Sequence, residues 1–327
     1  MNQSIIQISL LSMFLVVAFS GIILQCATPA WSQPNLSFSN IYEPSDAIQI
    51  IDGSVLIVED EGDHPLQLFS IASEKGELLL SPKVITGDKI KANDLEGITE
   101  GGKGDVFLIT SHSATKKDKR SKSREQLLKV EIRGQHISHL QVVDDLLPYI
   151  QKQLQESLNL SKDDIDDINI EGIAYNHVKE TLLIGLRTPL YQDRALMLSL
   201  LNPYDLFSKK QEPKFDPKII SLDLQGGGIR AIAYDKIHAQ YYFAGESQNK
   251  KGKLRSRLWV WDSKMNNKPA RVEWPNMKGL KNIEGIAIVQ YEGLPYLLFV
   301  CDDGDRKQGQ GGSYGLVNRK ELSFKQQ

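Results

Sequence analysis

The chain has little cysteine and little net charge, and both shortages limit what it can be. Among its 327 residues only Cys26 and Cys301 are cysteines, and the formal net charge is −2. Once an N-terminal leader is removed, Cys301 has no partner within the chain, so no intrachain disulfide is expected. Its neighbours Leu297–Val300 are apolar, which favours a small buried side chain over a catalytic thiol. Near-neutral charge argues against nucleic acid as a partner, because nucleic-acid-binding domains carry basic patches.

Several motifs that would identify a reaction are also missing. His136 and His139 are three residues apart on a strand-like run and face opposite sides, so they do not form a zinc site. The glycines 226–228 precede a strand-like segment rather than a helix, which excludes a dinucleotide-binding loop. The acidic cluster at 163–167 lacks the glycine and the closing glutamate of an EF-hand, and we expect a solvated acidic loop there.

The one long apolar run lies at the N-terminus. Ile5–Leu24 is almost wholly apolar, and Ala30–Ser32 supplies small residues at the −3 and −1 positions of a signal-peptidase site. We predict a secretory signal peptide over residues 1–32 and a single domain over residues 33–327. The expected location is the periplasm or the cell exterior. Since the run is also long enough for an uncleaved anchor, membrane attachment is the alternative.

An acidic phrase recurs along the rest of the chain. Its copies are Asn93-Asp-Leu-Glu-Gly-Ile-Thr99, Asn169-Ile-Glu-Gly-Ile-Ala-Tyr175 and Asn282-Ile-Glu-Gly-Ile-Ala-Ile288. A degenerate copy, Gly228–Tyr234, carries Arg230 in place of the glutamate. Each copy opens a unit of short β-branched and aromatic runs separated by turn residues, which are strand signals. Repeated units of several strands are typical of a β-propeller.

Five such units can be traced, counting one that begins at Asp46. The predicted fold is therefore all-β, a five-bladed β-propeller. Six blades would require the outermost segments to form a blade of their own. The segment Leu36–Phe38 is expected to close the ring by joining the last blade. Between the second and third units, apolar residues spaced by four predict a helical insertion on the top face: Leu146, Ile150, Leu154 and Leu158.

Propeller geometry predicts a ring of ionisable side chains at one mouth of the central channel. In each blade the start of the innermost strand and the end of the second strand meet at the same face, where side chains lie opposite one another. The five predicted pairs are Asp46 with Asp60, Glu96 with His112, Glu171 with Arg187, Arg230 with Glu246, and Glu284 with Asp302. Either these groups neutralise one another as ion pairs, or the excess carboxylates hold a cation.

The second interpretation assigns a role to each residue. Oxygen ligands favour a hard cation such as Ca²⁺, and the candidate ligands are Glu96, Glu284, Asp302, Asp60 and Asp46. The candidate catalytic residues are His112 (as general base), Arg187 and Glu171. The candidate ligand-binding residues are Arg194, Arg230 and Glu246. A cation held here would bind a phosphate or polarise an ester carbonyl.

Four phrases together carry a family resemblance: Asn93–Ile98, Thr110–Ser113, Ile184–Leu190 and Gly228–Asp235. They resemble an uncharacterised bacterial β-propeller family. The Glu-Gly-Ile phrases are also similar to those of extracytoplasmic propellers of the esterase-like phytase group. The resemblance implies a site on the channel face and, from the phytase-like relatives, calcium-dependent hydrolysis of phosphoesters or esters.

Two functions remain open from the sequence. The first is an exported propeller with an acidic, calcium-dependent hydrolytic site at the channel mouth. The second is a non-enzymatic propeller that docks a cell-surface partner or a small anionic ligand. Basic loops at Lys116–Arg124 and Lys250–Arg257 are either solvated or form a positive rim that attracts an anion. Neither loop has interleaved aromatic residues, so neither indicates nucleic-acid binding.

Overall fold

The computed structural model describes residues 34–60, 65–75, 77–117, 119–248, 254–264, 268–275, 277 and 281–326. The predicted signal peptide and Cys26 lie outside the described residues, as does part of the second basic loop. In the part of the chain that is described, no helix has both the length and the apolar character needed to cross a membrane.

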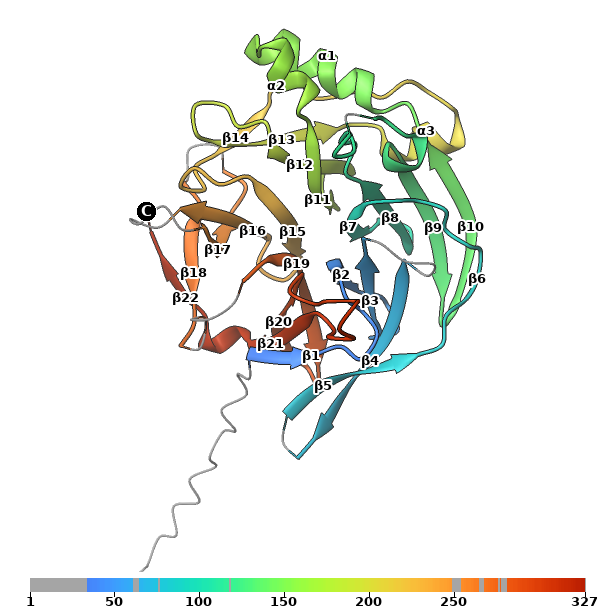
Figure 1. The fold of residues 1–327 in the computed structure, drawn as a ribbon, viewed down its shortest axis with the longest axis vertical. Helices are drawn as coiled ribbons and strands as arrows, with labels where there is room; N and C mark the ends of the chain where they lie inside the picture. The colour runs from blue at the N-terminus through green and yellow to red at the C-terminus, as the bar shows by residue number, and fades with distance from the viewer. Residues whose placement is uncertain are drawn as a thin grey trace, which may run out of the picture. The chain divides into compact units, whose positions relative to one another are not determined.

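Five sheets stand around a central axis as the blades of a propeller (Figure 1). The first blade is β2 (Pro44–Gln49), β3 (Val55–Glu59), β4 (Leu66–Glu74) and β5 (Glu77–Lys83). The second is β7 (Leu95–Glu100), β8 (Asp105–Thr110), β9 (Leu127–Arg133) and β10 (His136–Val143), with β6 (Thr86–Gly87) parallel to β10 at its edge. The third is β11 (Asn169–Asn176), β12 (Thr181–Thr188), β13 (Ala195–Leu200) and β14 (Ile220–Leu222).

The last two blades contain the terminal strands. The fourth is β15 (Ile229–Asp235), β16 (Gln240–Gln248), β17 (Leu254–Trp261), β18 (Ala270–Glu273) and β22 (Ser323–Lys325). The fifth is β19 (Ile283–Tyr291), β20 (Leu294–Cys301), β21 (Ser313–Asn318) and β1 (Pro34–Ser37). Leu36 pairs with Tyr314, so the predicted closure of the ring by the N-terminal segment is confirmed. The five-bladed prediction is confirmed as well.

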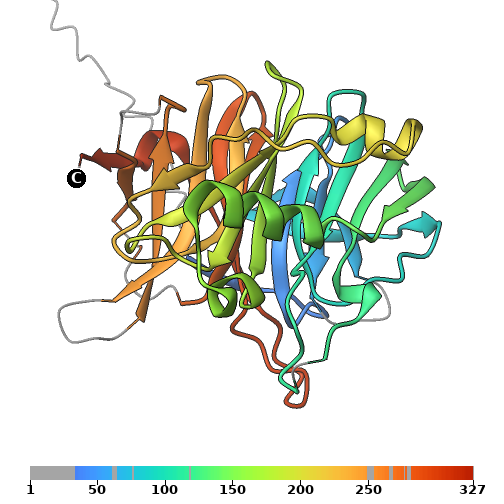
Figure 2. The same cartoon turned by 90° about the horizontal axis from the view of Figure 1, so that it is seen from above.

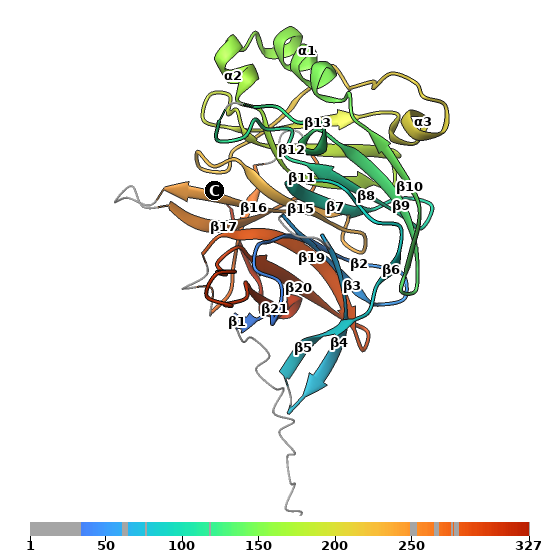
Figure 3. The ribbon, with the colours of Figure 1, turned by 45° about the vertical axis from the view of Figure 1, so that its right-hand side comes forward.

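The blades are held together by apolar side chains on both faces of each sheet. Val55–Val58 of β3 and Leu182–Leu186 of β12 are buried along their whole length, as expected for strands that read as continuous apolar runs. The strands of each inner edge lie next to the channel (Figure 1), and the β4–β5 hairpin extends outward from the rim (Figure 3).

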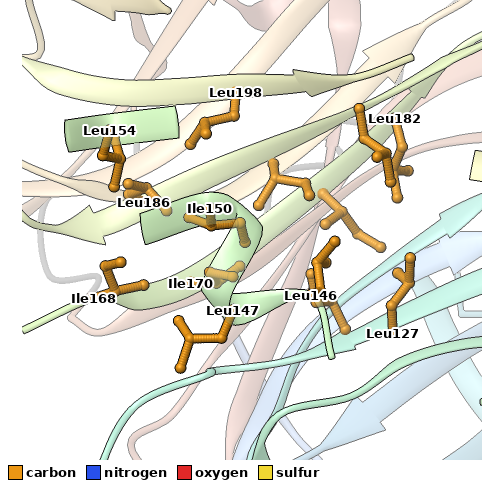
Figure 4. Packing of buried hydrophobic residues seen from close by; sticks show 14 of the residues in the cluster. Leu127, Leu146, Leu147, Ile150, Leu154, Ile168, Ile170, Leu182, Leu186 and Leu198 are labelled. Atoms are coloured by element: carbon orange, nitrogen blue, oxygen red, sulfur yellow. The ribbon is translucent and has the colours of Figure 1, made fainter. Parts of the chain in front are cut away.

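The predicted helix is α1 (Leu147–Leu158), which packs on the seam between the second and third blades. Ile150 and Leu154 are fully buried, among apolar residues of both blades (Figure 4). In Figure 1 this helix lies at the periphery of the ring, away from the channel. The acidic stretch that follows is not a loop as predicted: it forms α2 (Lys162–Asp166), with Ser161 accepting a hydrogen bond from the Asp164 N–H at 3.1 Å. A third helix, α3, spans Pro203–Ser208.

A β-bulge occurs at the same place in every innermost strand. In β7, Leu95 pairs with Thr110 and Gly97 with Ile109, which leaves Glu96 as the extra residue. A bulge turns the chain locally and redirects one side chain. The five bulge residues are Ser45, Glu96, Glu171, Arg230 and Glu284.

The residue after the bulge explains the glycine in the recurring phrase. A Cβ atom on Gly285 would lie 2.5 Å from the Cα of Asp46, and one on Gly172 would lie 3.1 Å from the backbone nitrogen of Ile232. Neighbouring innermost strands therefore approach one another closely at this level. The Glu-Gly-Ile phrase thus combines two features. Its glutamate is the bulge residue, and its glycine is the small residue where two strands meet.

Candidate functional site

The bulge residues and the residues that face them at the ends of the second strands together form one charged end of the channel. The second set, read from the same strand registers, is Asp60, Ser111, Arg187, Glu246 and Asp302. We call these two sets, with Asp94, the charged mouth. The loops that follow β8 and β20, teal and red in Figure 2, project from one end of the propeller.

The predicted pairing is right in three blades and one residue out in two. Glu171 with Arg187, Arg230 with Glu246 and Glu284 with Asp302 occupy the two sets as expected. In the first blade the bulge residue is Ser45, and Asp46 falls where the other blades carry a glycine or Ala231. In the second blade the residue after the strand is Ser111 rather than His112, because Thr110 pairs with Leu95.

Asp46 connects three innermost strands and lies outside the carboxylate cluster described below. Its side chain is fully buried, and its Oδ1 accepts hydrogen bonds from the N–H groups of Ala47 at 2.9 Å and Ile286 at 3.3 Å. Its Oδ2 accepts from the N–H of Ile98 at 3.0 Å. Burial raises the pKa of Asp46 well above its ordinary value, even though these hydrogen bonds lower it.

His112 is enclosed by the loop that follows β8. It has a positive φ of 54°, no exposed surface, and an Nδ1 that donates to the Thr110 carbonyl at 2.8 Å. Arg120 donates to the His112 carbonyl at 3.0 Å. Burial lowers the pKa of His112 to about 4, so the ring is neutral at neutral pH. In the described part of the chain no hydrogen-bond partner reaches its Nε2.

One half of the charged mouth is an ion-pair network centred on Arg230. Its Nη1 lies 2.9 Å from Glu246 Oε2 and its Nε lies 3.2 Å from Glu171 Oε2, the latter without hydrogen-bond alignment. Its Nη2 contacts Glu284, and Arg187 Nη1 lies 2.6 Å from Glu171 Oε1. Here the first interpretation of the ring applies, because two arginines neutralise most of the charge of three glutamates.

The other half holds a cluster of three carboxylates from Asp60, Asp94 and Glu96. One oxygen of each lies within 4.8 Å of the other two. Asp94 is ion-paired with Arg124. Glu96 is only 9% exposed, and no hydrogen bond or ion pair to its carboxylate is found within the described ranges. Burial, with the negative charges of Glu171, Asp60 and Asp94, raises the pKa of Glu96 well above its ordinary value.

Asp94 was overlooked in the sequence, although it stands in the quoted phrase Asn93–Thr99. It precedes the bulge by two residues and has a positive φ of 64°. The signal that could have revealed it is that this copy alone has a second acid two positions before the shared glutamate.

Two candidates remain, Asp302 in the charged mouth and Arg194 in the turn before β13. Asp302 has a raised pKa, caused first by burial and then by the charge of Glu43, while Arg230 lowers it. Arg194 lies at the end of a turn in which its backbone pairs with Tyr191, immediately before β13. Neither residue belongs to the three-carboxylate cluster.

The chain also contains a Gly-x-Ser-x-Gly match at residues 311–315. Ser313 begins strand β21, is 6% exposed, and donates through its hydroxyl to Asp303 at 2.7 Å. A nucleophile elbow needs a sharp strand-to-helix turn. A serine inside a paired strand does not provide one.

The first basic loop contacts the charged mouth. Arg124 pairs with Asp94 and donates to the Ser113 hydroxyl at 2.9 Å, and Arg120 donates to the backbone carbonyl of Asp166 at 3.0 Å. These arginines therefore make contacts within the protein, and this loop is not simply solvated.

Comparison with solved structures gives distant likenesses. An α-L-arabinofuranosidase from Clostridium thermocellum ATCC 27405 is 10% identical, with a TM-score of 0.47 over 88% of this chain and 97% of that one. A protein of unknown function from Dyadobacter fermentans DSM 18053 is 10% identical, with a TM-score of 0.47 over 89% and 99%. The soluble aldose sugar dehydrogenase of Escherichia coli is 10% identical, with a TM-score of 0.46 over 88% and 99%. No curated protein matches the chain.

The family comparison is more specific. A family model described as "Protein of unknown function (DUF3616)" matches residues 111–314, which is more than half of the chain. The match runs from the end of β8 to the start of β21 and includes three of the five bulge residues, Glu171, Arg230 and Glu284. The chain is thus a five-bladed β-propeller that belongs to the DUF3616 family.

Proposed function

We propose that the protein binds a divalent cation, Ca²⁺ foremost, at the cluster of Asp60, Asp94 and Glu96. The observation that carries this is Glu96, a carboxylate that is 9% exposed, has no bonding partner among the described residues, and faces two further carboxylates. An ionised carboxylate in such a place is strongly disfavoured unless a cation compensates it. Ligand distances of about 2.3–2.6 Å allow oxygens on one Ca²⁺ to lie up to roughly 5 Å apart, which suits the 4.8 Å span.

The cluster would leave room for a ligand on the cation. Ca²⁺ takes about 6–8 oxygens. With one oxygen from each of the three side chains, water or a bound anion would provide the rest. Such a cation would hold a phosphate or polarise an ester carbonyl. Arg124 and Arg187, from the edges of the charged mouth, would pair with an anionic group. Hydrolysis of phosphoesters or esters, as in the esterase-like phytases, is the proposed activity.

The enclosure of His112 favours a second candidate function, binding without catalysis. Its ring donates to the Thr110 carbonyl and has no exposed surface, which argues against a role as general base at the charged mouth. Proton transfer would then be carried out by a carboxylate of the charged mouth such as Asp302, whose pKa is raised. If no carboxylate acts in this way, the site binds a small anionic ligand through the cation and releases it unchanged.

The proposed setting is the periplasm or the cell exterior, and it is supported by the apolar run Ile5–Leu24 alone. Membrane attachment through the same run is the alternative.

Metal content and hydrolysis should be measured on the same preparation. We expect one Ca²⁺ per protein by equilibrium dialysis, and turnover of phosphoesters or simple esters that chelator abolishes and Ca²⁺ restores. Bound Ca²⁺ with no turnover would select the binding function. Absence of Ca²⁺ in wild-type protein would contradict both.

A further inference from the structure

A cavity lies at the opposite end of the channel from the charged mouth. Its volume is about 440 Å³, and it is lined where the innermost strands end and turn. Sites for small molecules are typically cavities of about 300–1,000 Å³ lined mainly by apolar and aromatic side chains. We call this region the apolar mouth. Its aliphatic wall includes Ile48, Ile50, Ile98, Ile232, Ile286 and Ile288.

The carboxylate of Asp46 is bonded to backbone groups of residues that line this cavity. Three of the lining residues, Ala47, Ile98 and Ile286, donate their N–H groups to its carboxylate. These bonds tie β2, β7 and β19 together between the two mouths. None of Asp60, Asp94 and Glu96 lines the cavity, so its lining is distinct from the carboxylate cluster.

The charged groups at the apolar mouth are matched by partners within the fold. Lys236 is ion-paired with Glu100. Asp235 is 1% exposed, accepts from the N–H of Ile237 at 3.0 Å, and lies 3.3 Å from Arg319 Nε. A cavity whose charges are already paired offers little to compensate a buried charge on a ligand.

An aromatic wall completes the lining. The ring of His177 stacks on Tyr234 with centroids 6.2 Å apart and meets Tyr175 edge-on at 5.0 Å. Burial and the charge of Lys236 lower the pKa of His177, so this imidazole is neutral at neutral pH. Neutral stacked rings favour contact with flat or aliphatic surfaces of a ligand.

Exposed aliphatic side chains extend the cavity outward. Ile51, in the turn between β2 and β3, is 88% exposed, and Ile237, between β15 and β16, is 66% exposed. Both are lining residues. Large aliphatic side chains left in water beside an apolar cavity indicate a surface that a ligand covers.

We propose that the apolar mouth binds a small, uncharged, largely apolar molecule, at a site separate from the cation cluster. Aliphatic walls, a stacked aromatic pair and internally paired charges select against ligands with a net charge.

A matched pair of fluorescent probes tests this selectivity. N-phenyl-1-naphthylamine is neutral, and 1-anilinonaphthalene-8-sulfonate adds one negative charge to a closely similar skeleton. We expect the neutral probe to bind one per protein with blue-shifted emission, at least about tenfold more tightly than the sulfonate. Failure of the neutral probe to bind folded wild-type protein, or tighter binding of the sulfonate, would overturn the proposal.

Two variants locate the probe. Ile288→Glu places a charge on the wall and Ile48→Trp fills the cavity, and both positions are partly exposed. Each should weaken the neutral probe about tenfold or more. The control Val142→Glu, at a 46% exposed position of β10, should leave binding unchanged. Thermal unfolding checks that each variant is folded, and unchanged binding in the folded variants would place the probe elsewhere and overturn the assignment.

The two sites can be tested separately. Chelator and Glu96→Gln should leave probe binding unchanged, because both act at the far end of the channel. Loss of probe binding with either would mean that the apolar mouth is not an independent site.

Discussion

At the scale of single residues, the bulge position decides how each blade contributes to the charged mouth. Glutamate occupies it in three blades, Ser45 in the first and Arg230 in the fourth. Because Arg230 contacts Glu171, Glu246 and Glu284, one basic residue allows three acids to be ionised near the axis. Glu96 lies apart from those contacts, and this difference separates an ion-pair network from a candidate cation site.

Removing the Arg230 cation should destabilise the protein strongly. Arg230→Met leaves three largely buried carboxylates without their shared partner, and loss of one member of a buried pair typically costs about 3–5 kcal/mol. The free energy of unfolding from urea titration measures this loss. Glu131→Gln, at a partly exposed position of β9, is the control and should change stability by less than about 0.5 kcal/mol. Equal stability of Arg230→Met and wild type would show that the network is dispensable.

His112 should make stability depend on pH at the acid side. Its pKa falls from 6.5 to about 4 in the folded protein, so the unfolded chain takes up the proton first as pH decreases. The stabilisation is complete above about pH 6.5 and is lost as pH falls towards 4, with a total of about 3 kcal/mol. His112→Asn, which tolerates the positive φ, should flatten this part of a urea-midpoint-versus-pH curve. An unchanged slope between these pH values would exclude His112 as its source.

At the scale of strands, four of the five blades have a glycine or alanine after the bulge, where neighbouring innermost strands approach closely. Gly285→Ala would place a Cβ atom 2.5 Å from the Cα of Asp46, where only backbone movement relieves the contact. We expect the free energy of unfolding to fall by about 1–3 kcal/mol. Gly172→Ala should cost less, because its nearest contact, at 2.9 Å, is with the side chain of Ile232, which can shift. Denaturation of both variants gives the order, and a reversed order would contradict this explanation.

The strands and the recurring Glu-Gly-Ile phrase could be recognised in the sequence. The register between the first two strands of a blade could not be predicted in two of the blades. Blade strands are apolar on both faces, so their sequences lack the alternation that fixes register. Pro44–Asp46 has no Glu-Gly pair to mark its bulge, and Asp46 occupies the place of a glycine. In the second blade, Ser111 and His112 both follow the strand, and only the pairing of Thr110 with Leu95 distinguishes them.

At the scale of the whole molecule, the two terminal strands differ in what they complete. β1 supplies the fourth strand of the fifth blade, a closure that the apolar segment Leu36–Phe38 made predictable. β22 adds a fifth strand to the fourth blade and is exposed along its length. Its sequence therefore has no apolar pattern that would predict a strand. Ring closure therefore depends on the N-terminal strand.

Proline placed in each terminal strand should reveal this difference. Leu36→Pro disturbs the pairing of β1 with β21 and is expected to lower Tm by several degrees, because it opens the ring. Phe324→Pro, its counterpart in β22, should change Tm much less, since β22 is an additional edge strand. Thermal unfolding followed by circular dichroism compares the two. Equal effects would mean that closure by β1 is not what holds the ring.

The most direct measurement is a calorimetric titration of Ca²⁺ into wild-type protein, Glu96→Gln and Glu246→Gln. Glu96 belongs to the proposed cation cluster, whereas Glu246 belongs to the Arg230 network. We expect one Ca²⁺ to bind wild type and Glu246→Gln with similar affinity, and Glu96→Gln to bind about 10- to 100-fold more weakly. Absence of Ca²⁺ binding in wild type, or equal binding by Glu96→Gln, would contradict a cation site at the charged mouth.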